Sequence, residues 1–191
     1  VSPTKMNVFY RGLPNPVEIS VPGVPSDKVD VRISGNHKIK KESDGTFTIT
    51  PGRDSKANVT VSAELPDGSK KTLPAKEFRV KRIPDPAPFF VGKTSSDRTI
   101  SKQALIGADG LGAQMVNFDF DVRVVVKSFS VSVSRDGTLV EKSSNSNRLS
   151  AEMKQLFNRV SRGNVVYFED IIVGMPDGTE RQVAAMKLKV N

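Results

Sequence analysis

The chain has 191 residues, 37% of them hydrophobic and 26% charged, and it contains no cysteine and no tryptophan. This composition can form ordered cores, and the lack of cysteine excludes disulfides and thiolate metal sites. The net charge is +8, with 15 Lys and Arg against 9 Asp and Glu in residues 1–84. Nucleic-acid-binding proteins usually place such charge beside stacking aromatic residues, and this chain has two tyrosines. We therefore expect no nucleic-acid partner.

No stretch contains about 18 consecutive apolar residues, so we expect no membrane-spanning helix and no direct membrane contact by this chain. The sequence begins at Val1 without a secretory leader. We interpret it as a mature fragment of a longer protein.

The first part of the chain, residues 1–83, is predicted to consist of short strands separated by turns. Turn residues such as Asp44-Gly45 and Pro51-Gly52 lie between the strands. About seven strands in some 80 residues predict an immunoglobulin-like β-sandwich. Apolar and polar residues alternate, which is the period of half-buried strands, over residues 17–21, 29–33, 47–49 and 59–63.

A proline-rich segment separates this domain from the rest of the chain. Three prolines at alternate positions lack backbone N–H groups and favour an extended, semi-rigid path. We therefore predict a linker at residues 84–88. Its inter-domain hinge residues are Pro84, Asp85, Pro86 and Pro88.

Residues 89–191 are predicted to form a second immunoglobulin-like β-domain with one inserted α-helix. Ser101–Gly107 is a candidate helical turn. The longest β-prone stretch is Met115–Ser134, whose alternation changes phase near Lys127, and this predicts a β-bulge there. Ser150 is a suitable N-cap, and an apolar stripe after it predicts a helix over about residues 150–161.

Two segments of the chain repeat each other at an offset of 110 residues. Leu65-Pro66-Asp67-Gly68-Ser69 returns as Met175-Pro176-Asp177-Gly178-Thr179, and a basic, partly alternating segment follows each copy. Pro-Asp-Gly is a favourable turn sequence. Each copy is predicted to form the last hairpin of its domain, so the chain is mainly β, with two tandem domains of related build.

Candidate catalytic and metal-binding residues are few. His37 is the sole histidine, which excludes sites that need two. Asp119 and Asp121 share one face of a predicted strand, but Arg123 continues that face and favours a charge-paired strand. The glycine-rich stretch 107–112 lacks the Lys-Ser/Thr ending of a phosphate-binding loop. We predict no enzyme activity, no cofactor and no metal site.

Two stretches resemble a known family. One is Phe78-Arg79-Val80-Lys81-Arg82-Ile83-Pro84-Asp85-Pro86, followed by Val91-Gly92. The other is Tyr10-Arg11-Gly12 with Asn15-Pro16-Val17-Glu18-Ile19-Ser20-Val21-Pro22-Gly23-Val24. Together they resemble GldM/PorM, the periplasmic shaft protein of type IX secretion and gliding motility. The resemblance covers essentially the whole chain, as the last two of four periplasmic domains, and leaves GldM and PorM as alternatives.

The resemblance implies a periplasmic segment of a protein that is anchored in the inner membrane. It implies a homodimer, and contact with GldL or PorL through a transmembrane helix that this sequence does not contain. It also implies contact with the outer-membrane-associated ring proteins GldK and GldN, or PorK and PorN. The expected function is then a non-enzymatic shaft segment that transmits force from the inner-membrane motor to the ring.

Candidate partner-binding residues lie in two irregular loops of the second domain, Thr94–Thr99 and Glu141–Asn147, which are rich in serine, asparagine and charge. The predicted contacts are Ser95, Ser96, Asp97, Arg98, Lys142, Asn145 and Asn147. Ordinary solvated loops are the alternative for both. The alternative for the whole chain is a generic extracytoplasmic β-sandwich module that binds a protein or a glycan, although it lacks the tryptophan platform usual in carbohydrate modules.

Overall fold

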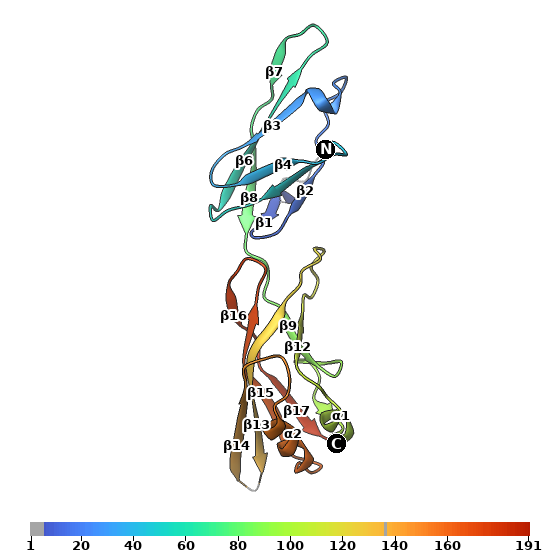
Figure 1. Ribbon diagram of the computed structural model, residues 1–191, viewed down its shortest axis with the longest axis vertical. Helices are drawn as coiled ribbons and strands as arrows, with labels where there is room; N and C mark the ends of the chain where they lie inside the picture. Colours follow the sequence, from blue (N-terminus) through green and yellow to red (C-terminus); the bar gives the residue numbers. More distant parts are fainter. Residues whose placement is uncertain (1–5, 136) are drawn as a thin grey trace. The chain divides into compact units, whose positions relative to one another are not determined.

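The computed structural model describes residues 6–135 and 137–191. The chain divides into two compact units, Val1–Ile83 and Pro84–Asn191 (Figure 1). Both units are mainly β and each has its own core, as the sequence predicts.

Unit 1 contains two sheets. Its strands are β1 (Val8–Tyr10), β2 (Asn15–Val17), β3 (Val29–Ile33), β4 (Lys38–Lys41), β5 (Phe47–Thr50), β6 (Lys56–Glu64), β7 (Lys70–Thr72) and β8 (Lys76–Lys81), with a 3-10 turn, η2, at Ser26–Lys28. The larger sheet has the order β1-β8-β6-β3, with β7 also paired to β6, and the smaller has the order β2-β5-β4. The pairing of β1 with β8 is parallel, whereas the other pairs in this unit are antiparallel.

Both sheets of unit 1 contribute to one core. Phe47 and Ile49 of β5 belong to the same buried cluster as Phe9 and Val59 of the larger sheet. Phe9 also stacks on Phe78, with 4.3 Å between the ring centroids. Burial of one such side chain stabilises the fold by about 1.5–3 kcal/mol. Two sheets over a shared core make the β-sandwich that the alternating sequence predicts.

Buried polar groups hold the chain between β1 and β2. The Asn15 side chain is 2% exposed; its oxygen accepts the Tyr10 N–H at 2.8 Å, and its amide donates to the Leu13 carbonyl at 2.8 Å. Arg11 donates from Nε to the Gly52 carbonyl at 3.1 Å. These bonds satisfy backbone groups outside the strand ladders. Arg11 and Asn15 therefore stabilise the turn between β1 and β2.

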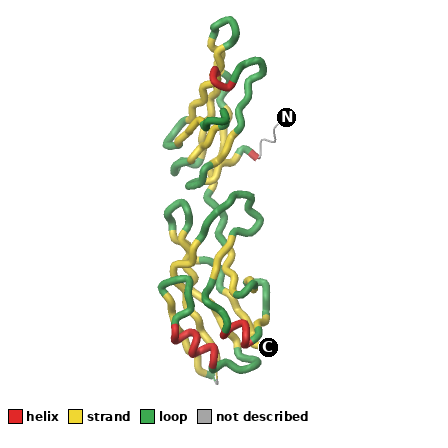
Figure 2. Tube along the Cα trace, turned by 45° about the vertical axis from the view of Figure 1, so that its right-hand side comes forward, coloured by secondary structure: helices red, strands yellow, loops and turns green. Residues whose placement is uncertain are grey.

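Unit 2 combines two sheets with two helices. Its elements are β9 (Ala87–Phe90), β10 (Lys93–Thr94), β11 (Thr99–Ile100), α1 (Lys102–Ile106), β12 (Gly112–Gln114), β13 (Val125–Arg135), β14 (Thr138–Ser144), α2 (Ala151–Asn158), β15 (Val165–Gly174), β16 (Glu180–Gln182) and β17 (Met186–Val190). The larger sheet has the order β11-β17-β15-β13-β14, with β16 paired to β15, and the smaller has the order β10-β9-β12. Both helices lie at the end of the unit that also holds the C-terminus (Figure 2).

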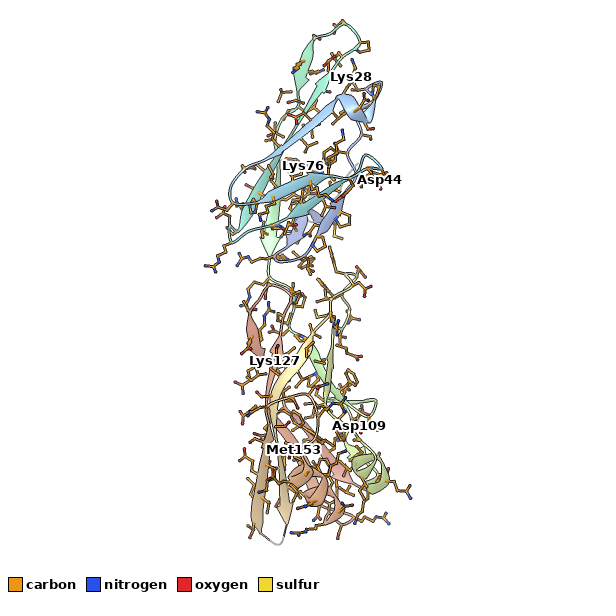
Figure 3. The ribbon with its side chains drawn as sticks, in the orientation of Figure 1. Lys28, Asp44, Lys76, Asp109, Lys127 and Met153 are labelled. Atoms are coloured by element: carbon orange, nitrogen blue, oxygen red, sulfur yellow. The ribbon has the colours of Figure 1, made fainter. Side chains whose placement is uncertain are left out.

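The core of unit 2 is aromatic. Phe90 of β9, Phe157 of α2 and Phe168 of β15 are all fully buried. The Phe90 and Phe168 ring centroids are 4.5 Å apart, and those of Phe157 and Phe168 are 6.3 Å apart. Met153 of α2 is also fully buried in this packing (Figure 3). The inserted helix therefore covers the larger sheet, which is why its apolar stripe is visible in the sequence.

The main helix, α2, begins as predicted and ends early. Ser150 is its N-cap and accepts the Met153 N–H on its side-chain oxygen at 3.2 Å. The helix ends at Asn158 instead of about residue 161. The reason is a tightened last turn, because the Arg159 and Val160 N–H groups each bond to a carbonyl three residues back.

The predicted long strand Met115–Ser134 is wrong in its first half. Within the described residues, 115–124 joins no sheet, although Phe118 and Phe120 are half-buried between exposed neighbours. The alternation thus predicted exposure correctly but not pairing. The predicted bulge is confirmed, because the register of β13 on β15 shifts on both sides of Ser128, next to Lys127 (Figure 3).

The two repeated Pro-Asp-Gly turns form hairpins with the same hydrogen bonds, as predicted. Asp67 Oδ1 accepts the Ser69 N–H at 2.9 Å, and Asp177 Oδ1 accepts the Thr179 N–H at 3.0 Å. The register of β7 on β6 equals that of β16 on β15 at the same offset of 110 residues. The turn sequence is therefore sufficient to set the local backbone of both hairpins.

Candidate functional site

The linker predicted at residues 84–88 is shorter in the structure. Strand β9 begins at Ala87, so Pro86 and Pro88, which are buried, belong to unit 2. Pro88 lies opposite Ala113 of β12. On the other side of β9, β10 pairs only with Phe89 and Phe90, so Pro88 has no neighbouring strand there that would need its N–H. Of the four predicted hinge residues, Pro84 and Asp85 lie before this strand and are exposed.

Asp85 is held by a buried arginine. Arg181 of β16 is 7% exposed, and its Nη1 donates to Asp85 Oδ1 at 2.8 Å. Its Nη2 donates to Asp177 Oδ2 at 3.0 Å. The Asp177 side chain is 6% exposed, whereas that of Asp85 is 67% exposed. We call these three residues the arginine cluster; it ties the start of unit 2 to the turn of its last hairpin.

The electrostatics of this cluster keep Asp177 ionised. Burial by itself would raise the pKa of Asp177. Hydrogen bonds from the Thr179 hydroxyl and N–H, together with the charge of Arg181, outweigh burial, so its pKa is lowered. An ionised Asp177 is the partner that a buried guanidinium needs, because an unpaired buried charge is strongly destabilising.

The first predicted partner-binding loop contains one structural residue. Asp97 accepts the Thr94 N–H at 2.9 Å, and this backbone hydrogen bond is the largest cause of a lowered Asp97 pKa. Asp97 therefore closes the turn between β10 and β11. Ser95, Ser96 and Arg98 are exposed and remain candidates for binding.

The second predicted loop is partly a strand. Glu141 to Ser144 belong to β14, and Lys142 lies opposite Val131 of β13, so the prediction of an irregular loop is wrong there. Asn145 and Asn147 are exposed, but the Asn147 carbonyl accepts the Leu111 N–H at 2.8 Å. An added Cβ at Gly110 would lie 2.0 Å from that same carbonyl oxygen, which explains one glycine of the stretch 107–112.

The strand order keeps the two loops apart. The first precedes β11 and the second follows β14, and these strands are the opposite edges of the six-stranded sheet. The structure therefore offers two separate candidate contacts.

His37 has a structural environment. It is 9% exposed; its Nδ1 accepts the Gly52 N–H at 3.0 Å, and its Nε2 lies 2.9 Å from the Lys56 carbonyl oxygen. The proton must then be on Nε2, and both ring nitrogens bond to backbone groups. This arrangement leaves no ring nitrogen for catalysis or metal binding.

Unit 1 carries an open hollow of about 660 Å³ beside β3 and β6. Lys28 (labelled in Figure 3) lies on its wall and pairs with Glu64 at 2.9 Å, and Arg32 pairs with Asp30 at 3.2 Å. These two pairs neutralise four of the charged side chains on the wall within the protein. Among the described residues, no group of three or more His, Cys, Asp or Glu side chains could hold a metal, and neither α1 nor α2 has the length and hydropathy to cross a bilayer.

Family models match both units of the chain. Residues 1–81 match the GldM third domain, and residues 84–191 match the GldM C-terminal domain. The chain belongs to the GldM family. This confirms the resemblance found in the sequence and connects the chain with gliding motility and type IX secretion.

The remaining comparisons are less specific. A solved structure described as "Structures of Clostridium thermocellum CbhA fibronectin(III)-like modules" is 14% identical, with 97% of this chain and 89% of that chain covered and a TM-score of 0.29. No curated protein sequence matches this chain.

Arg181 is a structural residue that the sequence pattern did not reveal. Two signals were present: the repeat aligns it with a lysine, Lys71, and Asp85 follows directly after the domain boundary. Arginine in place of lysine favours paired, buried recognition of carboxylates. That Asp85, 96 residues earlier in the chain, is its partner can be seen only in the three-dimensional structure.

Proposed function

We propose that this chain is a non-enzymatic segment of a periplasmic shaft that carries force from an inner-membrane motor to a ring at the outer membrane. Its membership of the GldM family supports a place in the gliding and type IX secretion machinery. The observation that carries the mechanical part is the parallel pairing of the first and last strands of unit 1.

Parallel neighbours resist tension applied at the two ends of a domain. The ladder of β1 and β8 joins Val8 to Arg79, Phe9 to Val80 and Tyr10 to Lys81. Tension at the ends of unit 1 pulls these strands in opposite directions along their own axes. The interstrand hydrogen bonds then bear the load together, whereas in a peeled hairpin they break one after another.

Unit 2 has features suited to the same task. Its last strand, β17, lies inside the six-stranded sheet, with β11 parallel on one side and β15 antiparallel on the other. At its start, the arginine cluster fixes Asp85 to the last hairpin. We propose that this clamp holds the first residues of unit 2 on its last hairpin when the chain is under load.

Single-molecule force spectroscopy tests the mechanical proposal. The chain lacks cysteine, so attachment cysteines can be placed freely. Handles at the two ends of unit 1 load β1 and β8 in shear, whereas handles at Ser55 and Arg82 peel β8 from β6. We expect a several-fold higher unfolding force in the first geometry, and equal forces in both would contradict the proposal.

We further propose that the exposed loop residues of unit 2 contact the ring proteins GldK and GldN, or PorK and PorN. The first variant replaces Ser95 and Ser96 with glycine and Arg98 with serine, and it keeps Asp97 because Asp97 closes the turn. The second variant replaces Asn145 and Asn147 with glycine. We expect loss of ring-protein capture in a pull-down from one or both grafts.

The control for that pull-down is a graft at Ser161 and Arg162, which are exposed in the same unit outside both loops. Capture that survives both loop grafts, with an unchanged circular dichroism spectrum, would place ring binding elsewhere.

A further inference from the structure

The longest edge strand in the described part of the chain is β14. It has seven residues and lies at one end of the six-stranded sheet, with β13 on one side only (Figure 1). The other strands at the ends of the sheets are β1, β2, β3, β4, β10, β11 and β12, which have two to five residues each. A long edge with unpaired N–H and C=O groups is a template for another strand, so this edge needs an explanation.

The register of the sheet decides which way the backbone groups of β14 face. Bonded and unbonded pairs alternate along an antiparallel ladder, and a residue bonded to one neighbouring strand turns its N–H and C=O away from the other. The Val190 N–H donates to the Asn164 carbonyl at 2.9 Å, so the backbone of Tyr167, three positions further along, is turned toward β13. Tyr167 lies opposite Ser132, and the backbone of Ser132 is therefore bonded to β15.

Three residues of β14 consequently offer backbone groups to the free edge. Glu141 lies opposite Ser132 in an unbonded pair, so its N–H and C=O point away from β13. Leu139 and Ser143, two positions away on either side, repeat this orientation, because the register of β14 on β13 has no shift. Within residues 6–135 and 137–191, these groups form no hydrogen bond. N–H and C=O groups at this spacing match the backbone of another extended chain.

Side chains beside the edge select the sequence of such a strand. Leu139 and Glu141 lie on one side of the sheet, and Val140 and Lys142 lie on the other. Leu139 is 60% exposed, and both charged side chains are exposed. Directly opposite cross-strand residues interact, and opposite charges are favourable there. The matching strand therefore has apolar residues opposite Leu139 and Val140, a base opposite Glu141 and an acid opposite Lys142.

We propose that the free edge of β14 binds an extended segment of another protein by strand addition. The added strand runs antiparallel to β14, as β13 does on the other side, which is the commoner pairing. From its N-terminal end it carries an acidic residue, a basic residue and two apolar residues. Main-chain hydrogen bonds to Leu139, Glu141 and Ser143 supply affinity, and the side chains supply selectivity.

The charges favour a different chain over a second copy of this one. Two copies of β14 in full antiparallel register would bring Glu141 against its own copy, and like charges directly opposite are destabilising. Charged side chains on an edge also protect it from unselective pairing. The inference uses β14 alone and depends neither on the proposed transmission of force nor on the proposed loop contacts.

Nuclear magnetic resonance titration of the isotope-labelled chain tests the proposal. The probe is a synthetic peptide whose central residues are Thr-Glu-Arg-Val-Val, at about 1 mM because one short strand binds weakly. We expect the amide resonances of Leu139, Glu141 and Ser143 to shift and their hydrogen exchange to slow several-fold, because their N–H groups become bonded. The amides of β3 and β4, which are edge strands of unit 1, should not respond. A wild type without these changes, or with the same changes at β3 or β4, would overturn the proposal.

A matched pair of variants separates the main chain from the side chain. S143P removes the N–H that faces the edge and no bond to β13, whereas S143A keeps this N–H. Both variants lose the Ser143 hydroxyl contact with the Ser130 hydroxyl at 3.1 Å. We expect S143P to weaken peptide binding about fivefold or more, and S143A less than about twofold. Equal binding by the two folded variants would contradict strand addition.

A charge exchange tests the register without any proline. A second peptide, Thr-Glu-Glu-Val-Val, sets an acid against Glu141 and should bind wild type several-fold more weakly than the first. E141K should reverse this preference. If both proteins bound the two peptides equally, the strand would not lie opposite Glu141 as proposed.

Discussion

The two hairpins that repeat each other along the chain share a backbone but differ in their surroundings. In the first, Asp67 and Lys71 are both exposed. In the second, the side chains of Asp177 and Arg181 are each 6% exposed, and Arg181 also reaches Asp85. The Pro-Asp-Gly turn thus fixes local geometry in both copies. The residue four positions after the aspartate, Lys71 or Arg181, determines whether the hairpin also forms an ion pair with a distant segment.

The same comparison applies to the electrostatics of the turns. The pKa of Asp67 is lowered chiefly by the hydroxyl and the N–H of Ser69. The pKa of Asp177 is also lowered, but against the opposing effect of burial and with the help of Arg181. A turn that stabilises itself in unit 1 has become part of a tertiary contact in unit 2.

Replacement of the central arginine should have the largest effect. Arg181→Ala leaves the Asp177 side chain, which is 6% exposed, without its cation, and we expect unit 2 to lose about 3 kcal/mol of unfolding free energy. Lys71→Ala, at the matching position in unit 1, should leave stability unchanged within error. Urea denaturation followed by circular dichroism measures the loss, and hydrogen exchange assigns it to a unit. Equal effects at both positions would mean that the two hairpins do not differ as described.

Truncation of the apolar residue before each turn should come next. Met175 is 6% exposed, whereas its counterpart Leu65 is half-buried. We expect Met175→Ala to cost about 3 kcal/mol and Leu65→Ala about 1 kcal/mol, because a cavity forms only where packing is complete. The same denaturation series measures both variants. A larger loss for Leu65→Ala would contradict the assigned burial.

The aspartates should differ in their dependence on pH. A pKa lowered by folding stabilises the protein above the unfolded value of about 3.9, and this stability disappears as the pH falls through the folded value. Asp177→Asn should therefore cost about 2 kcal/mol near neutral pH, and the gap to wild type should close in acid. Asp67→Asn should show a smaller gap with the same sign. If the difference in unfolding free energy between wild type and Asp177→Asn widened in acid, burial would have raised the pKa of Asp177 instead of the partners lowering it.

The smallest effect should come from the exposed arm of the arginine cluster. Asp85→Asn removes one charge that is 67% exposed, so we expect a loss below about 1 kcal/mol. Hydrogen exchange should nevertheless become faster at the amides of Asp85 and Ala87, because their tether is weakened. Unchanged exchange there would mean that Pro86 and β9 hold the segment without Arg181.

The sequence predicted those features that local chemistry determines. The turns at Asp67 and Asp177, the N-cap at Ser150 and the bulge beside Lys127 all depend on residues close together in the chain, and the structure confirms each of them. Alternation also predicted the exposure of residues 118–124.

Apart from the end of α2, the errors concern partners that local sequence does not reveal. Residues 115–124 have the pattern of a strand, but a strand needs a neighbouring backbone. Pro88 and Lys142 were predicted outside strands, yet β12 and β13 lie beside them. The contact of Arg181 with Asp85 spans 96 residues, and no local pattern can predict it.

The arginine cluster also has a consequence for the order of folding. A chain made from its N-terminus completes Ile83, the last residue of unit 1, long before Arg181 is added. Unit 1 can fold early, because its partners are all present, whereas Asp85 must wait for a residue near the other end of unit 2. A nascent or truncated chain that stops short of Arg181 would carry a folded first unit followed by an untied segment, and it would be open to proteases at the place where the finished protein is held.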